Sequence, residues 1–236
     1  ESETEAGNWV YGADCYYDTV DSYSRKYAAD GHLEKTEIQG PVADDASYVT
    51  AGAFVQDTIA LFDGGLDVTP GARYTHSRAD ADKVKDPVSG KKISVNESWD
   101  ALAASLRVLV PLTPDRRHVA YAGVAQGFRA PNLSDLTRLD IARSGELETA
   151  APELDPEEFT AFEAGVKSRT GKLVTQAAYY YTIIDNMIVR TPTGRVIDGN
   201  SEVTKKNSGK GYVQGVELAA RYHFTSSWSA WTALSW

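Results

Sequence analysis

Carboxylates are the most numerous ionisable side chains in this sequence. Asp80, Asp82 and Asp86 are spaced like the first ligands of a calcium-binding loop, but the glycine and the closing glutamate of such a loop are absent. A second acidic run lies between Glu146 and Glu158, and paired carboxylates can hydrolyse glycosides when a proton donor faces a base. Nothing in the run sets up such a pair, and no serine lies in a nucleophile-elbow pattern. We therefore expect no enzyme and no metal site.

Three other residues are candidates for contacting a ligand. His32 lies in the first long polar connection, whereas the other three histidines are dispersed along the chain. Arg129 stands just before Pro131, which cannot donate to a strand ladder, so Arg129 marks a strand end and Asn132 the base of the following loop. The guanidinium of Arg129 could pin that loop by pairing with a carboxylate, or it could contact a ligand. The sequence leaves both roles open.

The overall charge and the apolar runs exclude some classes of protein. The chain of 236 residues carries 33 acidic and 24 basic side chains, and its formal net charge of −9 disfavours binding to the phosphate backbone of a nucleic acid. No apolar run approaches the roughly 18 residues of a membrane-spanning helix. Strands that cross a membrane alternate apolar and polar residues, so this criterion does not exclude them. We expect neither a nucleic-acid-binding protein nor a helical membrane protein.

Alternation of apolar and polar residues predicts β-strands along most of the chain. Between Leu102 and Leu112 apolar residues occupy every second position, and 66–74 and 212–224 show the same period. An amphipathic helix would instead place its apolar residues three and four apart. We expect about nine strands, at residues 8–20, 47–61, 66–77, 98–112, 118–128, 157–168, 173–190, 212–224 and 228–236.

Short and long connections alternate between these strands. Short turns are expected at 62–65, 113–116, 168–171 and 225–227, and long polar connections at 21–46, 78–97, 129–156 and 191–211. In an outer-membrane barrel the short turns face the periplasm and the long loops face outward. The pattern therefore predicts an all-β fold, an antiparallel up-and-down transmembrane β-barrel.

Two details of the strands need a local explanation. Pro70 and Pro111 lie within strands, where each removes a ladder hydrogen bond and requires a bulge or an unpaired stretch. Aromatic residues near strand ends, among them Tyr48, Trp99 and Phe128, are expected to mark the membrane interfaces.

The strand pattern also fits proteins of other classes. A soluble or surface β-sandwich or propeller, used for adhesion or carbohydrate binding, would pack the apolar faces against each other. A passive porin or an outer-membrane barrel enzyme would also have membrane strands, although no loop nucleophile is recognisable for an enzyme. The residue pattern alone leaves these alternatives open.

Several segments resemble the barrel of TonB-dependent outer-membrane receptors. The most specific is the motif formed by Gly127, Phe128, Arg129, Ala130 and Pro131. The segments at 52–57 with 66–74, at 154–157 with 162–167, and at 207–209 with 215–218 are similar to further family segments in the same order. The resemblance covers about residues 47–236.

The resemblance implies a function and a set of partners. It implies an outer-membrane receptor of a Gram-negative bacterium that transports an iron chelate, either a siderophore or a haem-type ligand, and that is energised through a TonB complex. Residues 1–236 would form part of the barrel domain, in contact with outer-membrane lipid, and the plug domain and the remaining strands would lie outside this chain. In haem receptors a histidine lies between this motif and a second conserved segment, for which 151–154 is the candidate here. This sequence has no histidine between Asn132 and Ala150. No cofactor of the chain itself is expected, and the ligand contacts expected are His32, Arg129 and Asn132.

Overall fold

Strands make up most of the chain in the computed structural model, which describes residues 2–4, 7–86, 88–141 and 145–236. One antiparallel sheet contains ten strands in the order β1-β2-β5-β6-β7-β8-β11-β12-β15-β16. Its strands are β1 (Ser2–Thr4), β2 (Gly7–Val20), β5 (Asp44–Leu61), β6 (Leu66–Lys85), β7 (Lys92–Pro111), β8 (His118–Arg129), β11 (Glu157–Thr170), β12 (Leu173–Asp185), β15 (Lys210–His223) and β16 (Ser229–Ser235). Nine of them correspond to the nine predicted strands. In the described part of the chain, no helix is long and apolar enough to cross a membrane.

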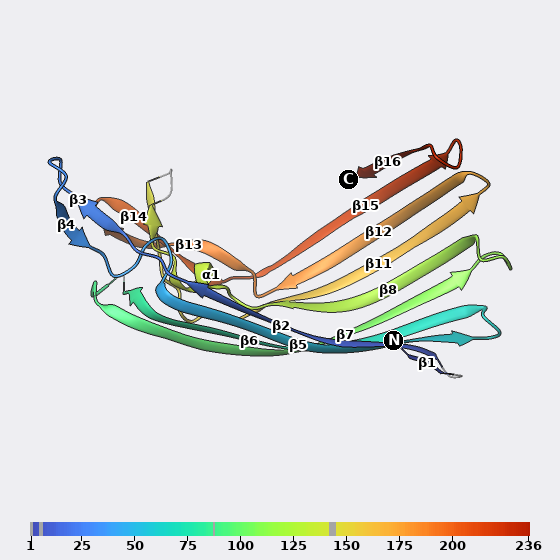
Figure 1. Ribbon diagram of the computed structural model, residues 1–236, viewed down its shortest axis with the longest axis horizontal. Helices are drawn as coiled ribbons and strands as arrows, with labels where there is room; N and C mark the ends of the chain where they lie inside the picture. Colours follow the sequence, from blue (N-terminus) through green and yellow to red (C-terminus); the bar gives the residue numbers. More distant parts are fainter. Residues whose placement is uncertain (1, 5–6, 87, 142–144) are drawn as a thin grey trace.

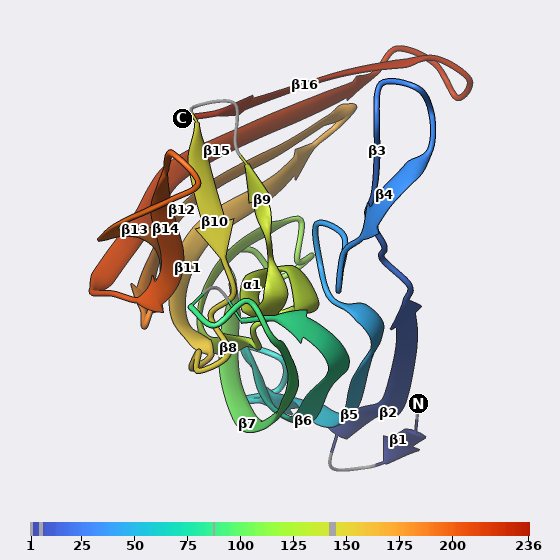
Figure 2. The same cartoon turned by 90° about the vertical axis from the view of Figure 1, so that its left-hand side faces the viewer.

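The ten-stranded sheet curves into an open arc (Figure 1). Viewed from the end of the strands, the arc encloses the short helix α1 (Leu133–Thr137) on its concave side (Figure 2). Ala79 and Ala81 of β6 belong to the same buried cluster as Leu136 of α1, so they face the inside of the arc. Because side chains alternate along a strand, Tyr74 and His76 face outward. The structure therefore confirms an antiparallel, partial barrel.

The convex face of the arc is apolar. Tyr11, Leu102 and Tyr179 have 63%, 74% and 47% of their surfaces exposed there. No second sheet covers this face among the residues that the structure describes. A β-sandwich would bury these side chains, so the sandwich alternative is wrong.

The concave face is polar, as the wall of a wide lumen would be. Arg73 of β6 bonds to Asp14 of β2 at 2.8 Å, from Nη1 to Oδ1, and Tyr121 donates to Glu163 at 2.9 Å. The polar and apolar residues of each strand are thus sorted onto opposite faces of one sheet, as the alternation predicts.

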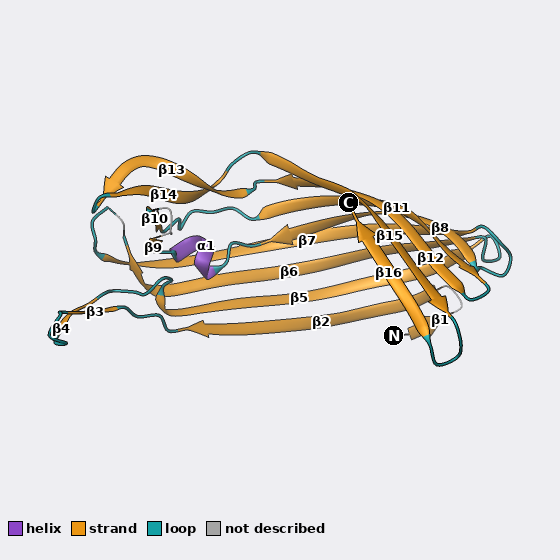
Figure 3. Cartoon of the chain, turned by 90° about the horizontal axis from the view of Figure 1, so that it is seen from above, coloured by secondary structure: helices purple, strands orange, loops and turns teal. Residues whose placement is uncertain are grey.

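The long connections contain two smaller sheets. The hairpin of β3 (Arg25–Tyr27) and β4 (Leu33–Thr36) forms one of them. The other, which we name the outer sheet, has the order β13-β14-β10-β9 and consists of β9 (Asp140–Ile141), β10 (Glu146–Thr149), β13 (Ile188–Ile197) and β14 (Asn200–Asn207). Both sheets lie at the same end of the arc, and the short turns lie at the other (Figures 1 and 3). The predicted segregation of long and short connections is confirmed.

Three predicted boundaries are wrong. The strand expected at 173–190 ends at Asp185, because Asn186 has a φ of 54° that interrupts the ladder, and Ile188 begins a strand of the outer sheet. The connection expected at 191–211 contains most of the β13–β14 hairpin. The connection expected at 78–97 is mostly strand, since β6 continues to Lys85 and β7 begins at Lys92.

The ladders show how the two prolines are accommodated. Between β5 and β6 the register is the same on both sides of Pro70, but Pro70 and Thr69 are not paired with Asp57 and Thr58, as expected beside a residue without an N–H. Pro111 is the last residue of β7, where a missing donor disturbs no further pairing. The pairing of β7 with β8 covers Ser105–Pro111 of β7 only.

A hydrophobic core lies on the concave side, at the end of the sheet where the long connections lie. Small side chains on β6, such as Ala79 and Ala81, leave room for Leu136 of α1, which is fully buried. Trp99 of β7 belongs to this core, and its indole Nε1 donates to the carbonyl oxygen of Leu154 at 3.2 Å. The expectation that Trp99 marks a membrane interface is therefore wrong, because its ring packs inside the arc.

Candidate functional site at the outer mouth

The chain turns inward directly after β8 and forms α1. Asn132 is the N-cap of this helix, and its side chain accepts a hydrogen bond from the amide of Asp135 at 2.9 Å. The carboxylate of Asp135 accepts in return from the amide of Asn132 at 3.2 Å, which completes a capping box. Pro131 is fully buried just before it. The motif 127–131 therefore ends a barrel strand and starts a short helix on the inner side of the wall.

Arg129 holds this turn in place. Its Nε donates to Oε2 of Glu157 at 2.6 Å and its Nη1 donates to Oδ2 of Asp135 at 2.7 Å. The predicted pinning of the loop by a carboxylate is confirmed, although the guanidinium uses two carboxylates from different elements instead of one. Contact of Arg129 or Asn132 with a ligand stays a prediction.

A second cation connects α1 to the outer sheet. Nζ of Lys205, on β14, lies 2.9 Å from Oδ1 of Asp135 and 3.3 Å from Oε1 of Glu148 on β10. Glu148 also pairs with Arg190 at 3.1 Å, between Oε2 and Nε. The acidic segment after α1 and the basic hairpin β13–β14 are therefore joined by complementary charges.

The ionisation of Asp135 follows from these contacts. Burial alone would raise its pKa, but hydrogen bonds from Lys205, Arg129 and the amide of Asn132 outweigh burial and lower the pKa below the ordinary value of 3.8. The carboxylate is therefore charged at neutral pH, as the ion pairs require.

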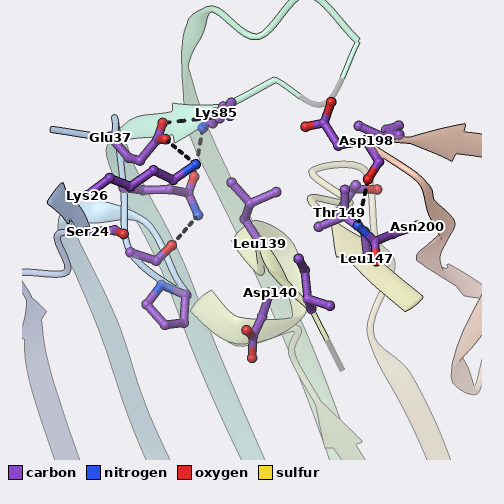
Figure 4. Close-up of a pocket in the computed structure, with 15 residues that line it drawn as sticks. Ser24, Lys26, Glu37, Lys85, Leu139, Asp140, Leu147, Thr149, Asp198 and Asn200 are labelled. Atoms are coloured by element: carbon purple, nitrogen blue, oxygen red, sulfur yellow. Dashed lines mark hydrogen bonds and ion pairs between the residues drawn. The ribbon is translucent and has the colours of Figure 1, made fainter. Parts of the chain in front are cut away.

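A pocket of about 360 Å³ opens beside α1, between the β3–β4 hairpin, the end of β6 and the outer sheet (Figure 4). Its lining combines apolar side chains with polar and charged ones. The lining residues are Ser24, Lys26, Glu37, Gln39, Gly40, Pro41, Lys85, Leu139, Asp140, Ile141, Leu147, Thr149, Ile197, Asp198 and Asn200. We call it the mouth pocket.

One wall of the mouth pocket is organised around Glu37 and Gln39. Oε1 of Glu37 lies 3.1 Å from Nζ of Lys26, and Oε2 lies 3.8 Å from Nζ of Lys85 (Figure 4). Hydrogen bonding from Lys35 is the largest of the effects that lower the pKa of Glu37. The buried Gln39 donates to the carbonyl oxygen of Thr137 at 2.8 Å and accepts from the amide of Lys85 at 2.7 Å. The side-chain amide of Gln39 therefore connects α1 to the end of β6.

The opposite wall comes from the segment after α1 and from the outer sheet. Its apolar side chains are Leu139, Ile141, Leu147 and Ile197, and its polar ones are Asp140, Thr149, Asp198 and Asn200. Such a pocket can bind a molecule with an apolar body and a polar edge. No group of three or more potential metal-ligating side chains occurs among the described residues.

Of the three residues predicted as ligand contacts, Arg129 and Asn132 meet at Oδ2 of Asp135, whereas His32 lies apart from them. His32 lies in the exposed turn of the β3–β4 hairpin, with Nδ1 2.6 Å from Oδ1 of Asp30, and does not line the mouth pocket. Arg129, at the end of β8, and Asn132, at the N-terminus of α1, do not line it either. Gln39 and Lys85 could not be predicted as lining residues, because the bonding partners of Gln39 are distant in the sequence and no local motif marks either residue.

Comparison with known proteins identifies a family with this architecture. The family profile described as "TonB dependent receptor-like, beta-barrel" matches residues 2–236. Among curated protein sequences, none matches the chain.

Several solved structures share the fold. A double mutant of the hemophore receptor HasR from Serratia marcescens, in complex with its hemophore HasA and heme, is 20% identical with a TM-score of 0.75, over 96% of this chain and 38% of that one. The copper transporter OprC is 19% identical with a TM-score of 0.74, over 99% of this chain and 36% of that one. The ferric yersiniabactin uptake receptor FyuA from Yersinia pestis is 19% identical with a TM-score of 0.62, over 100% of this chain and 33% of that one.

The chain thus spans 33–38% of the length of these three proteins. The profile match covers nearly every residue, and the curved antiparallel sheet with its long connections at one end agrees with it. The chain belongs to the TonB-dependent receptor family and forms part of its β-barrel.

Proposed function

We propose that this chain supplies part of the wall and of the outer mouth of an outer-membrane transporter for an iron chelate. The observation that carries the proposal is the mouth pocket, which lies where the long connections of a family barrel meet. Its volume of about 360 Å³ lies within the usual range for sites that bind small organic molecules.

The composition of the pocket supports a chelate over a bare metal ion. Leu139, Leu147 and Ile197 offer apolar surface, which stabilises the organic body of a chelator and gives nothing to a hydrated ion. Lys26, Lys85 and Asp198 offer charged groups at its edge. The names of similar structures include a heme complex, a ferric yersiniabactin uptake receptor and a copper transporter, so a chelate and copper are the two ligand classes to distinguish.

The remaining partners follow from the architecture. The apolar convex face would contact lipid of a Gram-negative outer membrane. A plug domain and further strands, supplied by the rest of the receptor, would fill and close the barrel, and a TonB complex would act on the plug. Tight binding alone would trap a ligand, so release requires a second state with lower affinity.

Binding to the full-length receptor tests the proposal. Haem, ferric yersiniabactin, ferric enterobactin and CuSO₄ are titrated separately in detergent, and binding is followed by quenching of tryptophan fluorescence. We expect saturable binding of one iron chelate, and we expect Leu147→Arg to weaken it at least tenfold, because the arginine replaces an apolar side chain of the pocket. Val196→Arg is the control, since Val196 is 69% exposed and does not line the pocket. Binding of copper alone, or chelate binding unaffected by Leu147→Arg, would contradict the proposal.

A further inference from the structure

A continuous chain of alternating charges runs from the outer sheet to the barrel wall. It begins with Arg190 and Glu148 in the outer sheet, 3.1 Å apart. Lys205 connects Glu148 to Asp135 of α1, at 3.3 and 2.9 Å. Arg129 then connects Asp135 to Glu157, the first residue of β11, at 2.7 and 2.6 Å. In order, the charged residues of this network are Arg190, Glu148, Lys205, Asp135, Arg129 and Glu157.

Lys205 is the buried link of this chain. Its side chain is 16% exposed, and those of Asp135 and Glu148 are 10% and 8% exposed. Nζ of Lys205 also donates to the carbonyl oxygen of Ser134 at 3.2 Å. Removal of this ammonium would leave each of two buried carboxylates with one partner fewer. Arg138, the C-cap residue of α1, also lies near Glu148, at 3.7 Å between Nε and Oε2, but its side chain is 41% exposed, whereas Lys205 bridges Asp135 and Glu148 from a mostly buried position.

Besides the charged residues, one backbone hydrogen bond joins the segment after β10 to α1, from the amide of Ala151 to the carbonyl oxygen of Leu136 at 2.9 Å, and the hairpin β13–β14 leaves the barrel through two short connections. Asn186 precedes β13 with a φ of 54°, and Gly209 follows β14 with a φ of 75°. Such left-handed residues break the ladder at both ends of the hairpin, and β14 pairs with β13 and β10 instead of with a barrel strand. The amide of Ile188 donates to Glu157 at 2.7 Å, and the side chain of Asn207 accepts from the amide of Asp155 and donates to its carbonyl oxygen, both at 2.8 Å. These contacts fix the base of the hairpin but not its tip.

We infer that Lys205 is a positioning residue that fixes the outer sheet against α1 and thereby sets the width of the mouth pocket. One wall of the pocket includes Leu147 and Ile197 of the outer sheet, whereas Gln39 and Lys85 belong to the side fixed on the barrel. Lys205 does not line the pocket, so it acts only through the placement of this wall. The importance of the pocket for a ligand rests on the proposed function, but the role of Lys205 in its geometry does not.

A distance measurement on the full-length receptor tests this inference without a ligand. Lys91→Cys and Val196→Cys are introduced in a Cys15→Ser background and spin-labelled. Lys91 is exposed in the connection between barrel strands β6 and β7, and Val196 is exposed on β13 of the outer sheet. We expect one narrow distance distribution in the parent protein. Lys205→Met should broaden the distance distribution and shift it to longer distances. Lys205→Arg, which keeps the charge, should retain the narrow distribution of the parent protein. Lys206→Met is the matched control, because Lys206 is the exposed neighbour on the same strand.

Hydrogen exchange separates a local role from general destabilisation. We expect the amides of β10 and β14 to exchange at least tenfold faster in Lys205→Met, with the amides of β6 and β7 unchanged. An unaltered distance distribution, or an equal acceleration in β6 and β7, would overturn the inference. Since neither measurement uses a ligand, failure of chelate binding would contradict the proposed function and leave this result standing.

Discussion

Arg129 shows how one side chain can organise a turn that leaves a barrel strand. Its guanidinium donates to Glu157 on the neighbouring strand and to Asp135 on the helix that follows. The planar fork of an arginine suits this double pairing, which a lysine could not reproduce with the same geometry. The motif 127–131 is thus explained structurally, by the turn that it forms.

Replacement of Arg129 by methionine should loosen this turn. Two mostly buried carboxylates each lose a charged partner, although Asp135 keeps Lys205. We expect a loss of stability of about 1–3 kcal/mol, the usual cost of leaving a buried polar group without its partner. Urea unfolding of the full-length receptor in lipid vesicles measures it. Arg169→Met, at the exposed opposite end of β11, should change the stability by about 0.5 kcal/mol or less. Equal effects of the two substitutions would contradict this role.

The lowered pKa of Asp135 predicts a dependence on acid. A carboxyl whose pKa is lower in the folded state stabilises that state above its unfolded pKa, and this stabilisation is lost as the pH falls through the folded value. The ordinary value is 3.8, so α1 should stay docked at neutral pH and loosen progressively below about pH 4. Hydrogen exchange of 133–139, corrected for the intrinsic effect of pH, checks this. Asp135→Asn should remove this contribution, and an unchanged acid dependence in that variant would contradict the assignment.

At the scale of elements, α1 is held mainly by apolar packing. Leu136 is fully buried against the small residues Ala79 and Ala81 of β6. Five residues are too few for a helix to be stable alone, so the packing has to hold it. The core at the mouth thus fixes one wall of the pocket through Gln39, which bonds to Thr137.

Leu136→Ala should detach this element. Truncation of a buried leucine to alanine costs about 2–5 kcal/mol. We expect trypsin to cleave after Arg138 in this variant faster than in the parent receptor, since the segment becomes accessible. The matched substitution is Leu102→Ala on the convex face, where Leu102 is 74% exposed and supports no packing on α1. A cleavage rate that is the same in both variants would show that Leu136 does not hold the helix.

The sequence predicts the elements whose signal is local and misses those that depend on distant contacts. Alternation between Leu102 and Leu112 suffices to predict β7, because the period of two reflects the two faces of a sheet. The break at Asn186 was missed, since the apolar residues on both sides conceal a change from one sheet to another. The mouth pocket could not be predicted, because Gln39, Lys85 and Leu147 meet only after the long connections fold together. Arg129 was predictable from its place before Pro131.

At the scale of the whole molecule, one curved sheet separates two environments. Its convex face is apolar and its concave face carries polar pairs such as Arg73 with Asp14. The long connections fold over the concave side at one end (Figure 2). Residues of these connections line the mouth pocket there. The central claim is that the convex face meets lipid, because the placement of the pocket at an outer mouth depends on it.

Spin-label accessibility tests this claim most directly. Single cysteines at Leu106 and Ser105, which lie on opposite faces of β7, are labelled in the full-length receptor with Cys15→Ser and reconstituted into lipid vesicles. Oxygen concentrates in the hydrocarbon layer, whereas a soluble nickel chelate stays in water. We predict that the label at Leu106 is relaxed mainly by oxygen and that the label at Ser105 is not. Equal accessibility at the two positions, or the reverse order, would contradict the account.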